Sequence, residues 1–483
     1  MRTRLFIAAA LIASMAGILA ADDATTTVGL EFYPNFQTLS VYAGYTGDAN
    51  ENASATLEYR ESGGEWREGH PLTRVYGKDW TGSIFGLTAG TQYDVRVTIH
   101  DPDGISEKTL TGSVQTRSDN WPVGSGRTIY VAAVSNGDGT EGAPFGTIQQ
   151  AVDAAGPGDT VLVGPGVYRE SVVVTKSGTP AAYILIKGEE GAVLDGSAAE
   201  FLDRSSPGRW QGVGQGRRRS VYDYVTDCDW PVDYMALDDR KLYGYDNLED
   251  MMTCRSGPPG GWYQDIDEGK LYVHVTMAYC GPDTRKTVVS RLSTGLKLEG
   301  AEYVVVEGLE VRYFGKYGIH VDGSNNVIQN CRVHHQDVGI HIYSKDVHNT
   351  TIQDNLVYQT MVDKWPWHMT KATRYEVDNI GARAGRGTVI RRNELYGSFD
   401  GIGLSVWEAL NEPGWIQDTD INNNYIHDCG DDGAEPEGTC VNLRFWKNRV
   451  DNCLMVMSIA PVTVGPAYFI NETYSNGWLG VLK

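Results

Sequence analysis

The sequence predicts an all-β protein with two structural parts, a β-sandwich followed by a single-stranded parallel solenoid. Among its 483 residues, 57 glycines and 27 tyrosines favour a turn-rich β architecture over a helical bundle. A short phrase with an asparagine between two apolar positions recurs in the C-terminal half, as expected for stacked coils. Near residue 95 apolar and polar side chains alternate instead, which is typical of a half-buried strand.

Residues 1–21 have the pattern of a secretory signal peptide. Arg2 and Arg4 precede the apolar run from Leu5 to Leu19, and two alanines follow it. The run is too short and wrongly flanked for a membrane span, and no other apolar stretch approaches the length that a span requires. We therefore expect a secreted protein, extracellular or periplasmic, without a membrane span.

Residues 22–118 are expected to form the β-sandwich, because Tyr93, Val95, Val97 and Ile99 alternate with polar neighbours. The stretch from Leu87 to Tyr93 reads Leu-Thr-Ala-Gly-Thr-Gln-Tyr. It resembles the tyrosine corner of fibronectin type III domains, Leu-x-Pro-Gly-Thr-x-Tyr, with an alanine in place of the proline. The resemblance implies a fibronectin type III-like accessory domain whose tyrosine hydroxyl bonds back to the backbone.

A linker at 119–127 leads to a second domain, 128–483, that begins with an amphipathic helix. Its stripe is Ile148, Ala151, Val152 and Ala155, with Thr147 as the expected N-cap. A helix before many short strands suits a cap over the open end of a parallel solenoid. This arrangement resembles the start of pectate-lyase-like right-handed parallel β-helix proteins, and implies that fold.

The repeated phrase places one asparagine in each coil. Successive asparagines are 25, 38, 31 and 24 residues apart, and are expected to form a hydrogen-bonded ladder between coils about 4.8 Å apart. A second strand follows each asparagine. Its β-branched and leucine positions are expected to point inward, so the alternate positions form a column of side chains on the outer face. The asparagines are Asn330, Asn355, Asn393, Asn424 and Asn448, and the outer column is His320, His341, Gly403 and Glu435.

A stretch at about 201–290, rich in Tyr, Trp and Asp, interrupts the repeat. We interpret it as an insertion packed on the solenoid, where it could form one wall of a groove. The chain has seven cysteines and no Cys/His spacing typical of a metal site. Cys429 and Cys453 each follow a ladder asparagine by five residues, so stacking predicts either a disulfide or a sulfur stack.

The charge balance excludes two classes of partner. With 41 Lys and Arg against 62 Asp and Glu, the formal net charge is −21. Binding to nucleic acid or to an anionic membrane surface requires a surplus of basic residues. We therefore expect neither nucleic acid nor an anionic membrane surface as a partner.

The strongest candidate for catalysis is a group of three aspartates. Asp400 precedes a glycine at the start of one predicted strand, and Asp431 and Asp432 precede a glycine one coil later. Aligning the Asp-Gly turns puts Asp400 beside Asp432, whereas counting from the asparagines puts it beside Asp431. In either register, closely spaced carboxylates cannot all stay ionised, so one pKa is expected to rise and supply a proton donor. Glycoside hydrolysis needs one protonated and one ionised carboxyl group.

About 35 residues around these aspartates resemble the polygalacturonases, whose motifs are Asn-Thr-Asp-Gly-Ile and Asp-Asp-Cys-Ile on successive coils. The resemblance implies inverting hydrolysis with Asp431 as general acid and Asp400 and Asp432 on the base side. Ser398-Phe399 replaces Asn-Thr, and the Gly-His-Gly and Arg-x-Lys motifs of that family are absent. Those motifs anchor the family's substrate, so their absence argues against polygalacturonase activity itself.

Aromatic and polar residues near the aspartates are candidates for binding a polysaccharide. Exposed indole faces stack on sugar rings, but the same tryptophans could instead pack the loops onto the solenoid. The candidates for substrate binding are His341, Trp365, Trp367, Lys371, Trp407, Glu408 and Glu435, with Trp415 in the same group of tryptophans.

Three functions are compatible with these observations. The first is a secreted glycoside hydrolase that needs no cofactor, with Ca²⁺ as an alternative occupant of the aspartate cluster. The second is a polysaccharide lyase or epimerase that acts on uronic acids with a lysine or arginine base. The third is a non-catalytic glycan-binding surface protein. The bases available to a lyase are Lys364, Lys371, Arg374 and Arg383.

Overall fold

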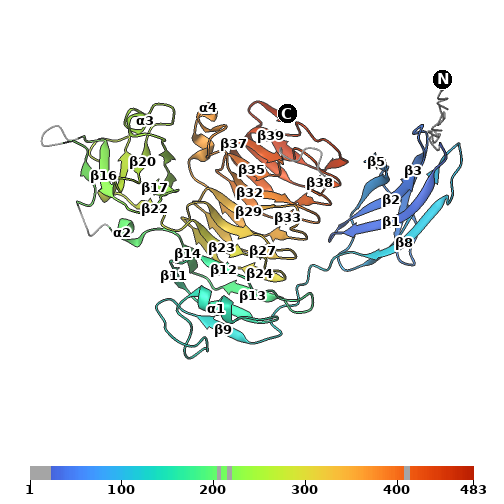
Figure 1. The fold of residues 1–483 in the computed structure, drawn as a ribbon, viewed down its shortest axis with the longest axis horizontal. Helices are drawn as coiled ribbons and strands as arrows, with labels where there is room; N and C mark the ends of the chain where they lie inside the picture. The colour runs from blue at the N-terminus through green and yellow to red at the C-terminus, as the bar shows by residue number, and fades with distance from the viewer. Residues whose placement is uncertain (1–22, 204–207, 215–219, 407–413) are drawn as a thin grey trace, which may run out of the picture.

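The computed structural model describes residues 23–203, 208–214, 220–406 and 414–483. Three parts are arranged side by side, with a long solenoid between an N-terminal β-sandwich and an inserted β-rich segment (Figure 1). The expected signal peptide, 1–21, lies outside the described residues, as do Trp407 and Glu408. In the part of the chain that is described, no helix is both long and apolar enough to cross a bilayer.

The N-terminal part consists of two four-stranded antiparallel sheets, ordered β1-β2-β6-β5 and β4-β3-β7-β8. Apolar residues from both sheets, including Val41, Leu57 and Val97, form one buried core. The backbone N–H of Thr88 donates to the Tyr93 hydroxyl at 3.0 Å, so this tyrosine makes the corner contact that its motif predicts. The strands are β1 (Thr26–Pro34), β2 (Thr38–Thr46), β3 (Ser54–Glu61), β4 (Arg67–Glu68), β5 (Thr73–Val75), β6 (Asp79–Phe85), β7 (Gln92–His100) and β8 (Thr109–Gln115).

The solenoid is a parallel β-helix with a continuous apolar interior. One face is a ten-stranded sheet, and the other two faces join into a sixteen-stranded sheet because β37 and β39 bend around the corner between them. Strands of the ten-stranded sheet are β9 (Thr128–Val131), β10 (Thr160–Val163), β13 (Ile184–Gly188), β24 (Val304–Glu307), β27 (Val327–Gln329), β30 (Thr351–Gln353), β33 (Val389–Arg391), β36 (Asp420–Asn422), β38 (Leu443–Trp446) and β40 (Ala467–Ile470). Strands of the larger sheet are β11 (Gly166–Tyr168), β12 (Val172–Val174), β14 (Ala192–Asp195), β23 (Thr294–Leu298), β25 (Glu310–Arg312), β26 (Tyr317–Val321), β28 (Arg332–His334), β29 (Val338–Ser344), β31 (Leu356–Tyr358), β32 (Asp378–Ala384), β34 (Glu394–Tyr396), β35 (Asp400–Gly403), β37 (Tyr425–Glu435), β39 (Arg449–Met457), β41 (Thr473–Ser475) and β42 (Gly480–Leu482).

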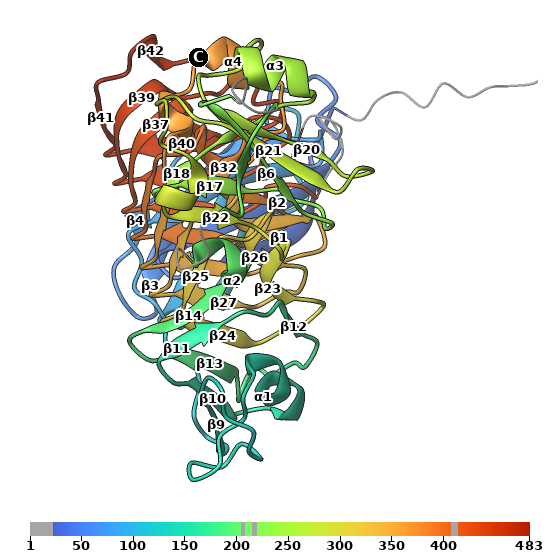
Figure 2. The same cartoon turned by 90° about the vertical axis from the view of Figure 1, so that its left-hand side faces the viewer.

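The amphipathic helix α1 (Ile148–Ala154) lies beside the first coils at one end of the solenoid (Figures 1 and 2). The Thr147 side chain accepts a hydrogen bond from the backbone N–H of Gln150, which is the expected N-cap. The Glu170 carboxylate accepts two further N–H groups of the first turn. Buried Ile148, Ala151 and Val152 join the solenoid core, so the helix covers the otherwise open end of the apolar interior.

The asparagine ladder forms in four of the five predicted positions. The backbone N–H of Asn355 donates to Asn393 Oδ1 at 3.0 Å, and the pattern continues through Asn424 to Asn448. The prediction for Asn330 was wrong, because Cys331 N–H donates to Asn355 Oδ1 and takes the ladder position. Asn330 is instead a left-handed turn residue with φ 53°.

The inserted segment leaves the solenoid after β14 and returns at β23, and it lies along one side of the coils (Figure 2). It has its own core, which includes Trp210, Trp262 and Val273. Its elements are α2 (Ala199–Leu202), β15 (Gln211–Gly212), β16 (Asp223–Asp227), β17 (Met235–Leu237), β18 (Arg240–Lys241), β19 (Tyr243–Gly244), α3 (Leu248–Thr253), β20 (Gly261–Asp265), β21 (Lys270–His274), η2 (Pro282–Thr284) and β22 (Thr287–Val289).

Buried polar contacts join the sandwich to the ten-stranded face of the solenoid. Arg444, which is 0% exposed, pairs with Asp420 at 2.6 Å and donates to the hydroxyls of Ser40 and Ser83 in the sandwich. The Thr38 hydroxyl donates to Asp420 Oδ2 at 2.6 Å. The ion pair lies on β36 and β38, which belong to coils near the predicted aspartate cluster. The sandwich therefore packs against and stabilises the coils that carry the cluster.

We expect Arg444→Ala to destabilise the protein by about 3–5 kcal/mol, because it leaves the Asp420 carboxylate buried without its charge partner. The free energy of unfolding, measured by chemical denaturation, checks this. Arg392→Ala is the matched control, since Arg392 forms a largely exposed pair with Asp354 and should cost about 1 kcal/mol or less. Equal losses in both variants would contradict a tightly packed interface between sandwich and solenoid.

Candidate active site

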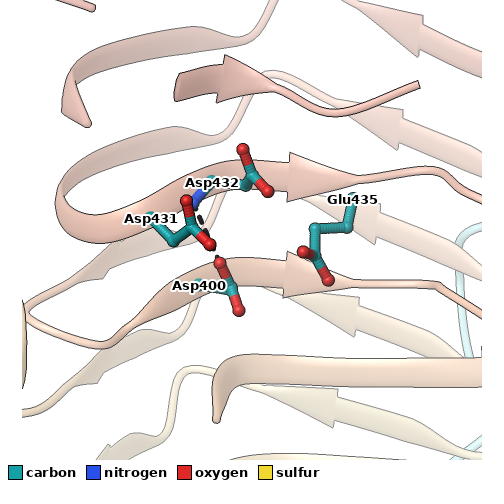
Figure 3. A group of neighbouring side chains, drawn as sticks. All are labelled: Asp400, Asp431, Asp432 and Glu435. Atoms are coloured by element: carbon teal, nitrogen blue, oxygen red, sulfur yellow. Dashed lines mark hydrogen bonds between the residues drawn. The ribbon is translucent and has the colours of Figure 1, made fainter. Parts of the chain in front are cut away.

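The register of the solenoid brings the predicted aspartates together. Ile402 of β35 pairs with Ala434 of β37, so Asp400 stands beside Asp432, and the Asp432 backbone N–H donates to Asp400 Oδ1 at 2.9 Å. Alignment on the Asp-Gly turns is therefore the correct choice. One carboxylate oxygen from each of Asp400, Asp431, Asp432 and Glu435 lies within 4.8 Å of the others (Figure 3).

Asp378 extends this group by one coil. It pairs in register with Asp400, which places Asp378, Asp400 and Asp432 in one column across β32, β35 and β37. The prediction from sequence missed Asp378, although the signal was present. Residues 378–381 read Asp-Asn-Ile-Gly and residues 400–403 read Asp-Gly-Ile-Gly, so the pattern Asp-x-Ile-Gly occurs on two successive coils.

The four clustered carboxyls are almost completely buried, with exposures of 1% for Asp400, 2% for Asp431, 0% for Asp432 and 8% for Glu435. Burial, reinforced by the neighbouring carboxylates, raises the pKa of Asp432 to about 6 and that of Glu435 to about 9. The same causes raise the pKa of Asp400 well above its usual range. Glu435 therefore keeps its proton at neutral pH, and Asp400 holds a proton more tightly than an exposed aspartate does.

Among the described residues, three cations contact carboxylates of this cluster or of the adjoining Asp378. The Lys371 ammonium lies 3.0 Å from Asp431 Oδ2, 2.5 Å from Glu376 Oε1 and 3.9 Å from Glu435 Oε1. Burial lowers the pKa of Lys371, but its contacts with Glu376 and Asp431 outweigh this effect, so the pKa is raised overall. The other two contacts are Arg383 Nη1 to Asp378 Oδ2 at 2.9 Å and Lys483 Nζ to Asp432 Oδ2 at 3.3 Å.

Aromatic packing fixes the segment that carries Lys371. This segment follows η3 (Val362–Lys364) and contains α4 (Trp367–Thr370). Buried Trp365 and Tyr375 pack against Tyr243 of the insertion, with ring centroids 5.4 and 4.8 Å from that tyrosine. The Tyr375 hydroxyl also accepts the Gly244 backbone N–H at 2.6 Å. Packing against the insertion therefore fixes the position of the loop that places Lys371 beside the carboxyl cluster.

A cavity of about 550 Å³ opens beside the cluster. Asp400 and Glu435 line it, whereas Asp431 and Asp432 are not among its lining residues. A Cβ at Gly403 would lie 2.0 Å from Asp378 Oδ1, so only glycine leaves space there for that carboxylate. The lining residues are Tyr343, Lys371, Thr373, Glu376, Asp378, Arg383, Asp400, Ser405, Glu435, Glu437, Ala460 and Lys483.

The remaining predicted binding residues are divided between this cavity and the packing around it. Lys371 and Glu435 line the cavity, but His341 does not, and its ring stacks on Tyr317 with centroids 4.2 Å apart. Trp365 is 6% exposed and Trp415 is 8% exposed, so these two indoles pack loops and offer no free face to a sugar. Trp367 is 42% exposed and lies outside the cavity lining.

The four clustered carboxylates also have the spacing of a cation site, as the Ca²⁺ alternative requires. Positive charge is already supplied there by two side chains of the chain itself, Lys371 at Asp431 and Lys483 at Asp432. The expected contact between Cys429 and Cys453 is also present, since the two residues pair in register. Both are buried free thiols rather than a disulfide.

Comparisons with known proteins identify the architecture. Residues 294–465 match the family model described as "Right handed beta helix region". No curated protein matches the sequence. The solved structure described as "The complex structure of XylC with xylose" is 17% identical with a TM-score of 0.48, over 74% of this chain and 68% of that one. "Crystal structure of pectate lyase Pel9A" is 16% identical with a TM-score of 0.36, over 71% of this chain and 79% of that one. The family match and the strand register together identify this region as a right-handed parallel β-helix.

Proposed function

We propose that the protein is a secreted carbohydrate-active enzyme that hydrolyses a glycosidic bond in the cavity beside Asp400. One observation carries the proposal: Glu435 and Asp378 line the same cavity with opposite environments. Burial and neighbouring carboxylates favour a proton on Glu435, whereas Arg383 balances the charge of Asp378. A carboxyl that holds its proton and a carboxylate that is paired with an arginine, facing one space, supply the two groups that glycoside hydrolysis requires.

In this proposal Glu435 donates its proton to the glycosidic oxygen as the leaving group departs. The Asp378 carboxylate faces the ring carbon, where it stabilises the positive charge that develops and accepts a proton from the attacking water as its oxygen bonds to that carbon. Burial, together with the negative charges of Asp378 and Asp432, raises the pKa of Glu435 to about 9, which keeps its proton bound at neutral pH. This assigns the acid to Glu435 instead of Asp431, because Asp431 lies behind the cavity and contacts the Lys371 ammonium.

Elimination by a lysine or arginine base is less well supported, because the candidate bases are engaged elsewhere. Lys371 contacts carboxylates and has a raised pKa, so it holds its proton. Arg383 pairs with Asp378, Lys364 pairs with Asp363 at 2.6 Å, and Arg374 donates to the Tyr375 hydroxyl. A base must be deprotonated to abstract a proton, and these groups are held in the charged form.

Two further proposals concern the N-terminal region. The leader pattern of residues 1–21 supports export. The two antiparallel sheets and the Tyr93 corner support a fibronectin type III-like accessory domain over 22–118, joined through 119–127 to the β-helix domain at 128–483.

Product chemistry tests the proposed reaction. The protein is incubated with a panel of polysaccharides, with and without a chelator, while reducing ends and ultraviolet absorbance are followed. We expect reducing ends to increase in both conditions without the absorbance of an unsaturated uronate. Absorbance that is lost on chelation would support a metal-dependent lyase, and retention of a polysaccharide without cleavage would support a glycan-binding protein.

A further inference from the structure

We infer that the cavity accepts an uncharged sugar unit and excludes uronic acids, an inference that rests on the proposed glycoside hydrolysis. The protein would then act on a neutral glycan, unlike the polygalacturonases that its aspartate motifs resemble. The argument depends on which charged groups face the cavity and on how each cation is already paired.

Carboxyl groups outnumber cations on the cavity wall. The acidic side chains that line it are Glu376, Asp378, Asp400, Glu435 and Glu437, and the basic ones are Lys371, Arg383 and Lys483. Asp431 and Asp432 lie directly behind them and add to the same negative field. A substrate carboxylate that entered this space would meet like charges in a partly desolvated site, where electrostatic repulsion is stronger than in water.

Each of the three lining cations among the described residues already contacts a carboxylate, and for Lys483 this is Asp432 at 3.3 Å. Lys371 contacts Glu376 and Asp431, and it lies within 4.0 Å of Glu435 as well. Arg383 uses Nη1 for Asp378 and Nε for the Ser405 carbonyl at 2.8 Å. Recognition of a uronate requires a cation that can form a charge-assisted hydrogen bond to it, and here the uronate would have to share each cation with a carboxylate that the cation already contacts.

The wall suits sugar hydroxyls instead. Asp400 is 1% exposed and lines the cavity, yet within the described ranges only its Oδ1 has a hydrogen-bond partner, the Asp432 N–H. Carboxylate oxygens accept hydrogen bonds, and sugar hydroxyls donate them. Ser405 and the 43% exposed Tyr343 add hydroxyl groups at the same cavity. A wall with both accepting carboxylates and donating hydroxyl and protonated carboxyl groups suits a neutral ligand with many hydroxyl groups.

Binding of matched sugars to a hydrolysis-deficient variant tests the inference. Pairs of oligosaccharides are prepared with the same linkage and length, one neutral and the other oxidised to the uronate at C6. Binding of each to Glu435→Gln is measured by calorimetry at low and high salt. We expect at least one neutral member to bind with a Kd at least tenfold lower than its oxidised partner. The difference should shrink at high salt, because ions screen the repulsion.

A second variant separates charge selection from shape. Glu376→Gln removes one partner of Lys371 and leaves an acceptor for the Ala372 N–H, which Glu376 Oε2 accepts at 2.6 Å in the native chain. When Glu376→Gln is combined with Glu435→Gln, the ratio of the Kd for the oxidised sugar to the Kd for its neutral partner should fall by at least threefold. A difference in Kd that stays unchanged would overturn the role of charge.

The outcomes for the inference and for the proposed reaction are distinct. Equal or tighter binding of the oxidised sugars, or no binding of any neutral member, would overturn the inference. If the wild-type protein hydrolyses a uronate, the inference fails while the proposed hydrolysis stands. If neutral sugars bind selectively but are not cleaved by the wild type, the hydrolysis fails while the charge selection stands.

Discussion

Replacing Glu435 with Gln is expected to lower kcat for glycoside hydrolysis by about 10²–10⁴-fold, the usual contribution of a positioned general acid. The amide keeps the size of the side chain but cannot donate the proton that the leaving oxygen needs. KM should change little, because the substitution leaves the cavity wall in place. Steady-state kinetics on the substrate found in the screen, with reducing-end detection, gives both constants.

The matched control is Glu394→Gln on the neighbouring face, since the Glu394 side chain is 52% exposed and is not among the residues that line the cavity. It should retain the wild-type rate. The wild-type rate should also fall as the pH rises through about 9, because Glu435 loses its proton over that range. Full activity in Glu435→Gln would show that another group protonates the leaving oxygen.

The sequence was sufficient to predict the β-helix because its signals are periodic. Inward residues such as Ile380, Ile402 and Ala434 recur at the same slot, and their shared parity predicts the outward column that contains Glu435. The helical cap and the ladder asparagines are equally local signals, with Thr147 and Asn393 in the expected roles. Each of these features depends on residues within one coil or on the next coil.

The composition of the cavity could be predicted only in part. Column neighbours such as Asp400 and Asp432 follow from stacking, but Lys371 reaches them from an inserted loop whose path depends on aromatic packing against Tyr243 of another insertion. No spacing rule relates these segments. The same packing explains why Trp365 is buried, since an indole in an insertion can face a core as readily as a ligand.

The clustering of buried carboxyl groups also lowers the free energy of unfolding. Among the groups facing Glu435 and Asp400, the cations balance only some of the carboxylates, so ionising the remainder is unfavourable in the folded state. Such sites trade stability for reactivity, and relieving the repulsion usually stabilises the fold while removing the activity. The charged and titratable groups that face this pair are Lys371 and Glu376 before β32, Asp378 and Arg383 on β32, Asp431 and Asp432 on β37, Glu437 after β37, and Lys483 after β42.

Asp400→Asn is therefore expected to stabilise the protein above neutral pH. The folded-state pKa of Asp400 lies well above its ordinary value, so the folded state holds the proton more tightly than the unfolded chain does. The stability linked to that proton is complete below the ordinary pKa, near 4, and is lost as the pH rises toward the folded-state value. Asparagine avoids this loss and preserves an oxygen to accept the Asp432 N–H, which Asp400 accepts at 2.9 Å.

The expected gain at pH 8 is about 1–2 kcal/mol, the usual size of the gain from a single stabilising substitution. It should decrease toward zero as the pH falls to 4, because the native aspartate is then protonated in both states. Thermal unfolding midpoints between pH 4 and pH 9 measure this, with Asp354→Asn on an exposed ion pair as a control that should show no such pH-dependent gain. The prediction would be wrong if Asp400→Asn lowered the unfolding midpoint by the same amount at pH 8 and at pH 4. Asp400 would then be an ionised group whose charge is balanced by its neighbours. Repulsion among the clustered carboxylates would then be weaker than the proposed role of Glu435 as the acid requires.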